Sequence, residues 1–288
     1  MASVVAQLRG RPVMPGGGPF IFGVLNCTPD SFSDGGRYGT VEAAVAAGCR
    51  MADAGADAID VGGESTRPGS RPEPADEQIR RTQSVIAELA RRFGATGPAL
   101  SIDTRLAEVA VAALDAGASI INDVSALRDD PRMADLAARR ARLVVLMHMR
   151  GTPADMQRDP VYDDVVAEVR AFLAGRIAAA VAAGVDRARI VVDPGIGFGK
   201  TTRHNLALLA RVGALRELGV PVMIGASRKR FIGELLGLDD PADRLMGTAA
   251  AAAICARAGV ECLRVHDVAE CRQAAIIGRA VRDAEARV

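Results

Sequence analysis

Residues 41–62, VEAAVAAGCRMADAGADAIDVG, contain one complete helix–turn–strand unit. Val41–Ala54 carries apolar residues at helical spacing, and Gly55 suits the left-handed position that closes a helix. Ala58–Gly62 is a short apolar run, as expected for a strand that is covered on both faces. The same AGA or AGV turn before a strand recurs at 116–118, 183–185 and 258–260. The sequence therefore predicts a repeated helix–strand unit.

Eight such apolar runs follow one another from Phe20 onward, with no linker between the units. They are Phe20–Asn26, Ala58–Gly62, Ala99–Thr104, Ser119–Val124, Leu143–His148, Ile190–Pro194, Pro221–Ala226 and Cys262–Asp267. Eight strand–helix units in 288 residues predict an α/β protein of the (β/α)8 (TIM) barrel class, which typically has about 250 residues. We expect one barrel domain over residues 20–288, preceded by a flexible tail at 1–19. An open, doubly wound sheet is the alternative that the pattern leaves possible.

The charges of the chain balance, and this excludes some partners. Lys and Arg total 36 and Asp and Glu total 35, for a net charge of +1. No bulk field therefore attracts nucleic acid or an anionic membrane. Only Lys200 and Lys229 are lysines, so the other 34 cations are arginines.

The composition also bears on the compartment. No apolar run reaches the ~20 residues that span a bilayer, and Arg9, Arg11 and Pro12 interrupt any signal-peptide core. The five cysteines are odd in number and lack zinc-site spacing. We expect a cytoplasmic protein with reduced thiols.

Polar residues stand at the carboxyl end of every predicted strand, which is where barrels of this class carry their chemistry. Asp103, Asn122 and Asp193 would converge there, and carboxylates with amides suit a flat heterocycle such as a pterin or purine. The last two strand ends add Arg228, Lys229, Arg264 and His266, at the place where such barrels often bind phosphate. The pattern predicts a heterocyclic ligand with a phosphate-type leaving group.

Other features limit the mechanism. Cys27–Gly39 and Gly63–Pro74 are long, turn-rich segments of the kind that form lids or binding loops. Gly195–Lys200 (GIGFGK) is rich in glycine but matches neither common phosphate-binding pattern. No HExxH or GxSxG motif is present. We therefore expect a displacement reaction without a covalent enzyme intermediate, in which Asn26 could offer an oxygen to Mg²⁺.

Eight motifs resemble those of the dihydropteroate synthases, in the order that family has them. They are GVLNCTPDSFSDGG (23–36), DVGGESTRPG (60–69), SIDT (101–104), IND (121–123), LMHMRGTP (146–153), DPGIGFGK (193–200), GASRKRF (225–231) and RVHD (264–267). The resemblance runs from about Phe20 to beyond His266. Cys27 departs from it, because that family more often has Val there.

The resemblance implies a transferase of folate biosynthesis that joins p-aminobenzoate to dihydropterin pyrophosphate, with Mg²⁺ as cofactor and sulfonamides as inhibitors. It implies a homodimer formed by late helices, for which the alanine-rich stretch Thr248–Ala258 is suited, although core packing explains that stretch equally well. The implied site residues are Asp103, Lys229, Asn26 and Asp34 for catalysis; Asp103, Asn122, Asp193, Lys229, Met147 and Phe198 for pterin; Asn26, Arg264 and His266 for pyrophosphate, with Asn26 also the metal ligand; and Phe32, Thr66, Arg67, Pro68, Phe198, Ser227 and Lys229 for p-aminobenzoate.

Two other functions compete with this one. A pterin-binding barrel such as a methyltetrahydrofolate:corrinoid methyltransferase shares the strand-end residues, but it needs neither a pyrophosphate site nor the two long loops. A non-catalytic paralogue would be expected to lack some motif residues, and none is missing. The length of the chain is used up by one barrel, so we expect no fused second enzyme.

Overall fold

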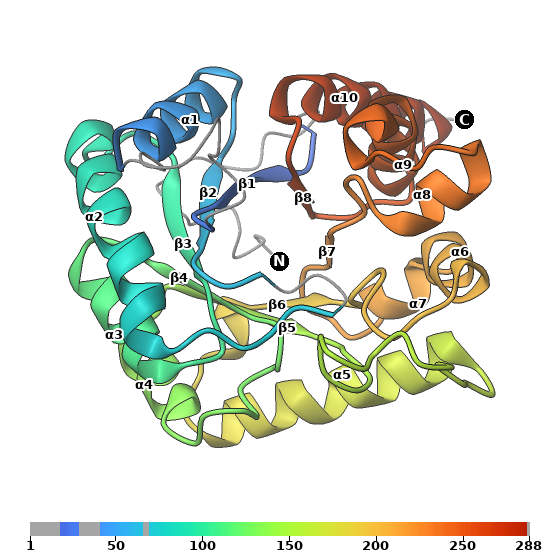
Figure 1. Ribbon diagram of the computed structural model, residues 1–288. Coiled ribbons are helices and arrows are strands. Elements are labelled where there is room, and N and C mark those ends of the chain that lie inside the picture. The colour runs from blue at the N-terminus through green and yellow to red at the C-terminus, as the bar shows by residue number, and fades with distance from the viewer. Residues whose placement is uncertain (1–17, 29–40, 66–68, 287–288) are drawn as a thin grey trace.

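The computed structural model describes residues 18–28, 41–65 and 69–286. Most of the tail predicted at 1–19 lies outside these ranges. Eight strands stand in the centre of the molecule with helices around them (Figure 1). They are β1 (Phe20–Asn26), β2 (Ala58–Gly62), β3 (Ala99–Asp103), β4 (Ile120–Asp123), β5 (Leu143–Met147), β6 (Ile190–Asp193), β7 (Met223–Ile224) and β8 (Cys262–Val265).

All neighbouring strands are parallel, in the order β6-β5-β4-β3-β2-β1-β8-β7. A parallel bridge between Val192 and Val222 joins β6 to the segment that leads into β7. The backbone N–H of Val192 also donates to the carbonyl of Pro221 at 3.0 Å. The sheet is thus a nearly closed (β/α)8 barrel, which confirms the predicted class and excludes the open sheet.

Helices follow the strands in the predicted order and surround the barrel. They are α1 (Val41–Asp53), α2 (Ala75–Phe93), α3 (Ala107–Asp115), α4 (Met133–Arg140), α5 (Val165–Ala182), α6 (Thr202–Ala210), α7 (Gly213–Arg216), α8 (Arg230–Leu236), α9 (Leu245–Arg257) and α10 (Val268–Glu285), with short 3-10 turns η3 (Arg187–Arg189) and η4 (Pro241–Arg244). The glycines predicted to close helices have positive φ, for example 93° at Gly55 and 114° at Gly117. They let the chain turn at once into the next strand.

The interior of the barrel changes from apolar to polar along each strand. Successive side chains of a strand point to opposite faces, so every second residue points inward. The first inward positions form a separate apolar cluster of Phe20, Phe22, Ala58, Ala99, Ile120, Leu143, Val145, Val191, Met223 and Cys262. Continuing at the same parity brings Asn26, Asp60, Asp103, Asn122 and Asp193 inward at the other end. The strand pattern itself therefore places the polar residues in the mouth of the barrel.

Among the described residues, the most extensive contact between two helices lies between α9 and α10. A side chain at Gly278 of α10 would collide with the carbonyl of Ala253 in α9, so only glycine permits this approach. The alanine-rich stretch of α9 therefore has a packing role within the monomer. The described part of the chain contains no helix that is both long and apolar enough to cross a bilayer.

Candidate active site

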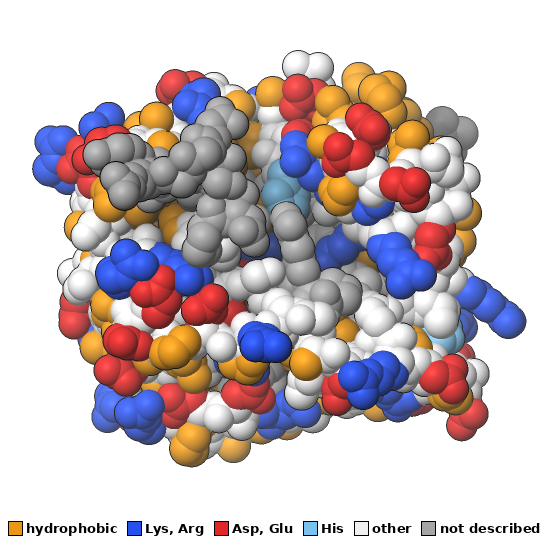
Figure 2. All heavy atoms as spheres, viewed as in Figure 1, with side chains coloured by type: hydrophobic (Ala, Val, Ile, Leu, Met, Phe, Trp, Pro, Cys, Tyr) orange, Lys and Arg blue, Asp and Glu red, His pale blue; other side chains and the backbone are white. Residues whose placement is uncertain are grey.

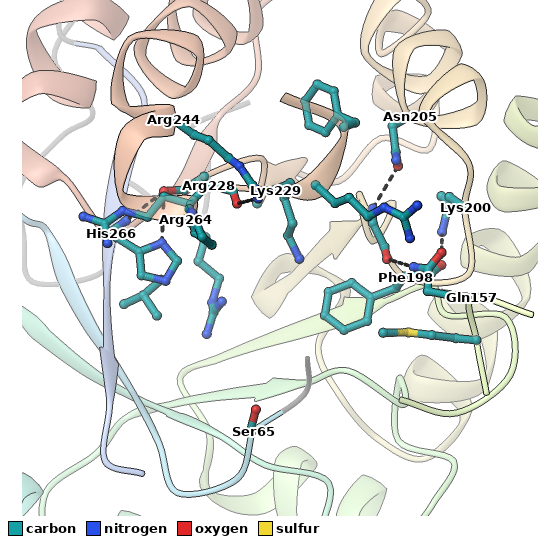
Figure 3. Close-up of a pocket in the computed structure, with 18 of the residues that line it drawn as sticks. Ser65, Gln157, Phe198, Lys200, Asn205, Arg228, Lys229, Arg244, Arg264 and His266 are labelled. Carbon is teal, nitrogen blue, oxygen red and sulfur yellow. Dashed lines mark hydrogen bonds between the residues drawn. The ribbon is translucent and has the colours of Figure 1, made fainter. Parts of the chain in front are cut away.

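One cavity of about 690 Å³ opens at the carboxyl ends of the strands (Figure 3). It is lined by residues of β1, β3 and β8 and by the segments that follow β2, β6 and β7. Seven of the predicted site residues lie on its wall: Asn26, Asp103, Phe198, Ser227, Lys229, Arg264 and His266. Asn122, Met147 and Asp193 are not part of the lining and are 4–5% exposed. Asp34, Phe32, Thr66, Arg67 and Pro68 lie outside the described residues.

A network of charges forms the floor of this cavity. The Nε of Arg264 donates to Asp60 Oδ2 at 2.6 Å, and its Nη2 donates to Asp103 Oδ2 at 2.7 Å. The side-chain amide of Asn122 donates to the same Oδ2 of Asp60 at 2.9 Å. Asp60 is fully buried, and its Oδ1 has no partner among the described residues. These contacts lock Arg264 in one direction, and its charge is shared with two carboxylates.

Burial changes the protonation of the acids on this floor. Burial raises the pKa of Asp103 to about 7; Arg264 opposes the rise, and Asp60 and Glu64 add to it. Burial also raises the pKa of Asp193, against its hydrogen bond from the Gly195 backbone. For Arg264, burial lowers the pKa but the two acids outweigh it, so the net shift is upward. Arg264 is a permanent cation, whereas Asp103 can bind or release a proton near neutral pH.

A strained turn directs Ser227 and Lys229 into the cavity. Arg228 between them has a φ of 57°, which is costly for a residue with a side chain. Its guanidinium forms two bonds to Asp267, with Nε–Oδ2 at 2.9 Å and Nη2–Oδ1 at 2.5 Å. Its backbone N–H donates to Thr248 Oγ1 at 3.0 Å. The sequence placed Arg228 among the residues of a possible phosphate site; in the structure its guanidinium is paired with Asp267, and it fixes the turn.

Lys229 lies against an aromatic wall. Its Nζ is 4.2 Å from the centre of the Phe198 ring, a distance at which a cation is attracted to the ring face. Burial lowers the pKa of Lys229 to about 8, and Arg264 lowers it further. Asp193 and Asp103 oppose this shift. The amine therefore stays mostly protonated at neutral pH.

His266 and Ser227 form a pair between the ends of β8 and β7. The Oγ of Ser227 lies 3.0 Å from His266 Nδ1, and the backbone N–H of His266 donates to that Oγ at 3.2 Å. Burial lowers the pKa of His266 to about 3, and the nearby Arg264 contributes. The imidazole is thus neutral. His266 therefore offers a hydrogen bond rather than a charge at this end of the barrel, and its assignment to the anion site stays a prediction.

The same region shows the state of the Cys27 thiol, the side chains available to a metal, and the distribution of surface charge. Burial raises the pKa of the Cys27 thiol to about 12, so it is not a reactive thiolate. The described residues contain no group of three or more His, Cys, Asp or Glu side chains that could hold a metal. In Figure 2, positive and negative side chains are mixed over this face and form no patch of one sign, in keeping with the balanced charge.

Sequence reasoning missed the importance of Asp60 and left Lys200 without a role. Asp60 entered the sequence analysis only as the first residue of the motif at 60–69, yet it joins Arg264 to Asn122. A carboxylate at the centre of the apolar run AIDVG is a signal that could have identified it. Asn205 of α6 was also missed, and its Oδ1 accepts the Gly197 N–H at 2.8 Å.

Comparison with known proteins gives the relationship directly. The model of the pterin binding enzyme family matches residues 22–266. Dihydropteroate synthase of Mycobacterium leprae is 50% identical over 255 residues, covering 86% of this chain and 88% of that protein. A probable bifunctional folylpolyglutamate synthase/dihydropteroate synthase of Haloferax volcanii is 45% identical over 266 residues. Those residues are 92% of this chain but only 31% of that longer relative.

Solved structures agree in fold and sequence. Xanthomonas albilineans dihydropteroate synthase with 4-aminobenzoic acid is 52% identical, with a TM-score of 0.85, covering 92% of this chain and 93% of that one. Yersinia pestis dihydropteroate synthase in a sulfonamide drug complex is 42% identical, with a TM-score of 0.85, covering 93% and 95%.

A barrel with this mouth, matched by that family model over most of its length, defines a pterin-binding enzyme. Within that class the chain belongs to the dihydropteroate synthases, transferases of folate biosynthesis. The resemblance stated from the motifs is confirmed, and the methyltransferase and non-catalytic alternatives are set aside.

Proposed function

We propose that this chain joins p-aminobenzoate to 6-hydroxymethyl-7,8-dihydropterin pyrophosphate within the cavity described above. The bond between the pterin methylene carbon and the pyrophosphate oxygen breaks, the aniline nitrogen forms the new bond to that carbon, and the nitrogen then loses a proton to solvent. Asp103, Lys229 and Arg264 on the wall of one cavity carry the proposal. Positioning in a site shielded from water, rather than a strong base, promotes this substitution.

The acids and amides at the barrel mouth fit the pterin ring. Asp193 uses Oδ1 to accept the Gly195 N–H at 2.7 Å. Its Oδ2 lies 3.7 Å from the point where a Cβ at residue 225 would stand, and Gly225 lines the cavity. The missing side chain leaves Asp193 Oδ2 open to an N–H donor of the ring. Asp103, Asn122 and Lys229 would complete the polar edge, and Met147 and Phe198, which share one apolar cluster, would cover a ring face.

The leaving group would lie beside Asn26, Arg264 and His266. Arg264 is held in place by Asp60 and Asp103, so it needs no reorganisation to meet developing negative charge. His266, being neutral, would donate a hydrogen bond rather than a charge. We assign the aminobenzoate to Phe198, Ser227 and Lys229, together with Phe32, Thr66, Arg67 and Pro68. Asp34 is assigned to the same catalytic mouth by family resemblance. Sulfonamides would compete for the aminobenzoate position.

Mg²⁺ fits the donors at the end of β1. The Oδ1 of Asn26 and the Oδ2 of Asp103 lie 3.8 and 3.9 Å from the point where a Cβ at Gly62 would stand, so glycine leaves space between two oxygen donors. Asp103 Oδ2 is already bonded to Arg264, which leaves Asn26 as the ligand from this group. Mg²⁺ is typically held by one or two protein oxygens with substrate phosphate and water. When bound, it would neutralise part of the charge on the departing pyrophosphate.

The test is a direct assay. The protein is incubated with the pterin pyrophosphate, p-aminobenzoate and Mg²⁺, and both products are measured. Dihydropteroate and pyrophosphate should form in equimolar amounts. Omission of Mg²⁺ should slow the reaction strongly, and Asn26→Ala should raise the Mg²⁺ concentration needed for half activity. Folded protein that forms no dihydropteroate would refute the proposal.

We further propose that the chain forms a homodimer through α9 and α10. Their outer faces expose large apolar side chains: Met246 is 78% exposed, Ile254 58% and Ile277 65%. Apolar side chains are visible over this edge at the upper right of Figure 2. Such a patch is typical of a protein interface. Ile277→Glu should reduce the mass measured by light scattering to that of a monomer, whereas Val181→Glu on α5 should not.

We also assign the chain to the cytoplasm. All five cysteines are free in the structure, and four of them are buried. Free thiols persist in a reducing compartment. Localisation of a tagged protein by cell fractionation would test this, and recovery from an oxidising compartment would contradict it.

A further inference from the structure

Lys200 ends the glycine-rich segment 195–200 and lies in a cage of acceptors. Only 3% of its surface is exposed. Its Nζ is 2.9 Å from His148 Nδ1 and donates to the backbone carbonyls of Phe198 at 2.9 Å and Gly195 at 3.0 Å. The His148 carbonyl is a fourth acceptor at 3.4 Å. Figure 3 shows Lys200 next to the segment that carries Phe198.

The cage suits a compact ammonium group. Burial lowers the pKa of His148 to about 2, and Lys200 lowers it further, so the imidazole is neutral and can accept. Burial also lowers the pKa of Lys200 to about 7, which Asp193 opposes and which Lys229 and Arg150 reinforce. Ammonium has three rotatable donors for these acceptors, whereas guanidinium has a rigid planar fork. Lysine stands here although 34 of the 36 cations of the chain are arginines.

The two carbonyls in the cage belong to residues that act on the site. The N–H of Gly195 donates to Asp193 Oδ1 at 2.7 Å. This N–H and the carbonyl that Lys200 binds stand on either side of the same Cα, so holding the carbonyl restrains the residue that orients the carboxylate. The ring of Phe198 lies 4.2 Å from Lys229 Nζ. Gly197 between them is held by Asn205 and by the side-chain amide of Gln157, which donates to its carbonyl at 2.5 Å. The glycine-rich segment is thus held in place at Gly195, Gly197 and Phe198.

We propose that Lys200 is a positioning residue whose buried amino group holds the Gly195 and Phe198 peptides and so aligns Asp193 and the Phe198 ring for the substrates. It acts through these two residues, since its own ammonium is occupied by the cage. The inference rests on the proposed function, which assigns the pterin to Asp193 and Phe198.

The test compares two substitutions of Lys200 that differ in the space left in the cage. Lys200→Ala opens a hole the size of an alkylammonium ion, and Lys200→Met fills it with an uncharged chain of similar length. Both variants should lose about tenfold or more in kcat/KM, because small misplacements of reacting groups are costly. Ethylammonium should restore part of the activity of Lys200→Ala but not of Lys200→Met. Tetramethylammonium, which cannot donate, should restore neither.

The matched control is Arg189→Met. Arg189 also donates to two backbone carbonyls, those of Ala141 and Ala138 at 2.8 and 3.0 Å, but it precedes β6 at the opposite end of the barrel. The Arg189→Met substitution should lower the unfolding temperature and leave the kcat/KM of the folded protein unchanged. If Lys200→Met does not fold, Lys200→Arg takes its place, and impaired turnover is expected there too.

Activity within about twofold of wild type in the folded Lys200 variants would overturn the inference. Equal effects of ethylammonium on the Ala and Met variants would also overturn it, because they would mean a general salt effect. If the wild type makes no dihydropteroate, the proposed function fails separately. In that case calorimetric binding of a pterin tests the positioning role of Lys200. The affinity should fall in Lys200→Met and not in Arg189→Met, and equal affinities would refute that role.

Discussion

Replacement of Asp60 by asparagine should be among the most damaging conservative changes in this chain. The carboxylate is fully buried and accepts from both Arg264 and Asn122. Asparagine keeps the size but removes the charge that faces Arg264. Leaving a buried charge uncompensated costs about 3–5 kcal/mol. Asp103 still compensates Arg264 at 2.7 Å, so we expect a loss closer to the 1.5–3 kcal/mol of a charged hydrogen bond, about 2–3 kcal/mol of unfolding free energy.

Urea unfolding measures that loss, and steady-state kinetics measures a second effect. Because Arg264 would lose one of its two anchors, we expect kcat/KM for the pyrophosphate substrate to fall while free pterin binds nearly as well. The control is Asp129→Asn, since Asp129 pairs with Arg105 at 2.6 Å but its side chain is 37% exposed. An exposed pair contributes about 0–1 kcal/mol. If Asp60→Asn costs no more than Asp129→Asn, the network is not the anchor that we infer.

Three further predictions concern the same site. Lys229→Arg should impair turnover strongly, because the planar guanidinium cannot replace a compact ammonium against Phe198; near-normal kcat would contradict this. Asn122→Ala should weaken pterin binding by about 2–4 kcal/mol in calorimetry, and unchanged affinity would remove it from the ring pocket. Because burial raises the folded pKa of Asp103 to about 7, the stability that Asp103 contributes is present below pH 4 and is lost as the pH rises to 7. The buried His148 and His266 shift stability in the opposite direction, so the quantity to compare is the difference in unfolding free energy between wild type and Asp103→Asn in urea. This difference should shrink as the pH rises from 4 to 7, and a constant difference would contradict the prediction.

The fold and the inward-facing polar residues could be predicted because both follow from local periodicity. The predicted strands agree with the observed ones within one or two residues, and parity along a strand then decides which side chains enter the mouth. The Arg264 contacts could not be predicted in this way. They join residues 204 and 161 positions apart, and nothing in sequence says which of several acids a buried arginine selects. The neutral state of His266 likewise depends on burial and on Arg264.

The composition singles out the two lysines but does not show that they lie in one site. Both line the same cavity, in a chain that otherwise uses arginine as its cation. Lys200 ends among carbonyl oxygens, and the stem of Lys229 lies 3.2 Å from the point where a Cβ at Gly197 would stand. A glycine thus makes room for one lysine while the other fixes the peptides on either side of that glycine. The two cations therefore support one structure, so the Lys200 variants should also disturb Lys229. In Lys200→Met the pKa of Lys229 should change when it is followed by the pH dependence of kcat/KM, and an unchanged profile would show that the lysines act independently.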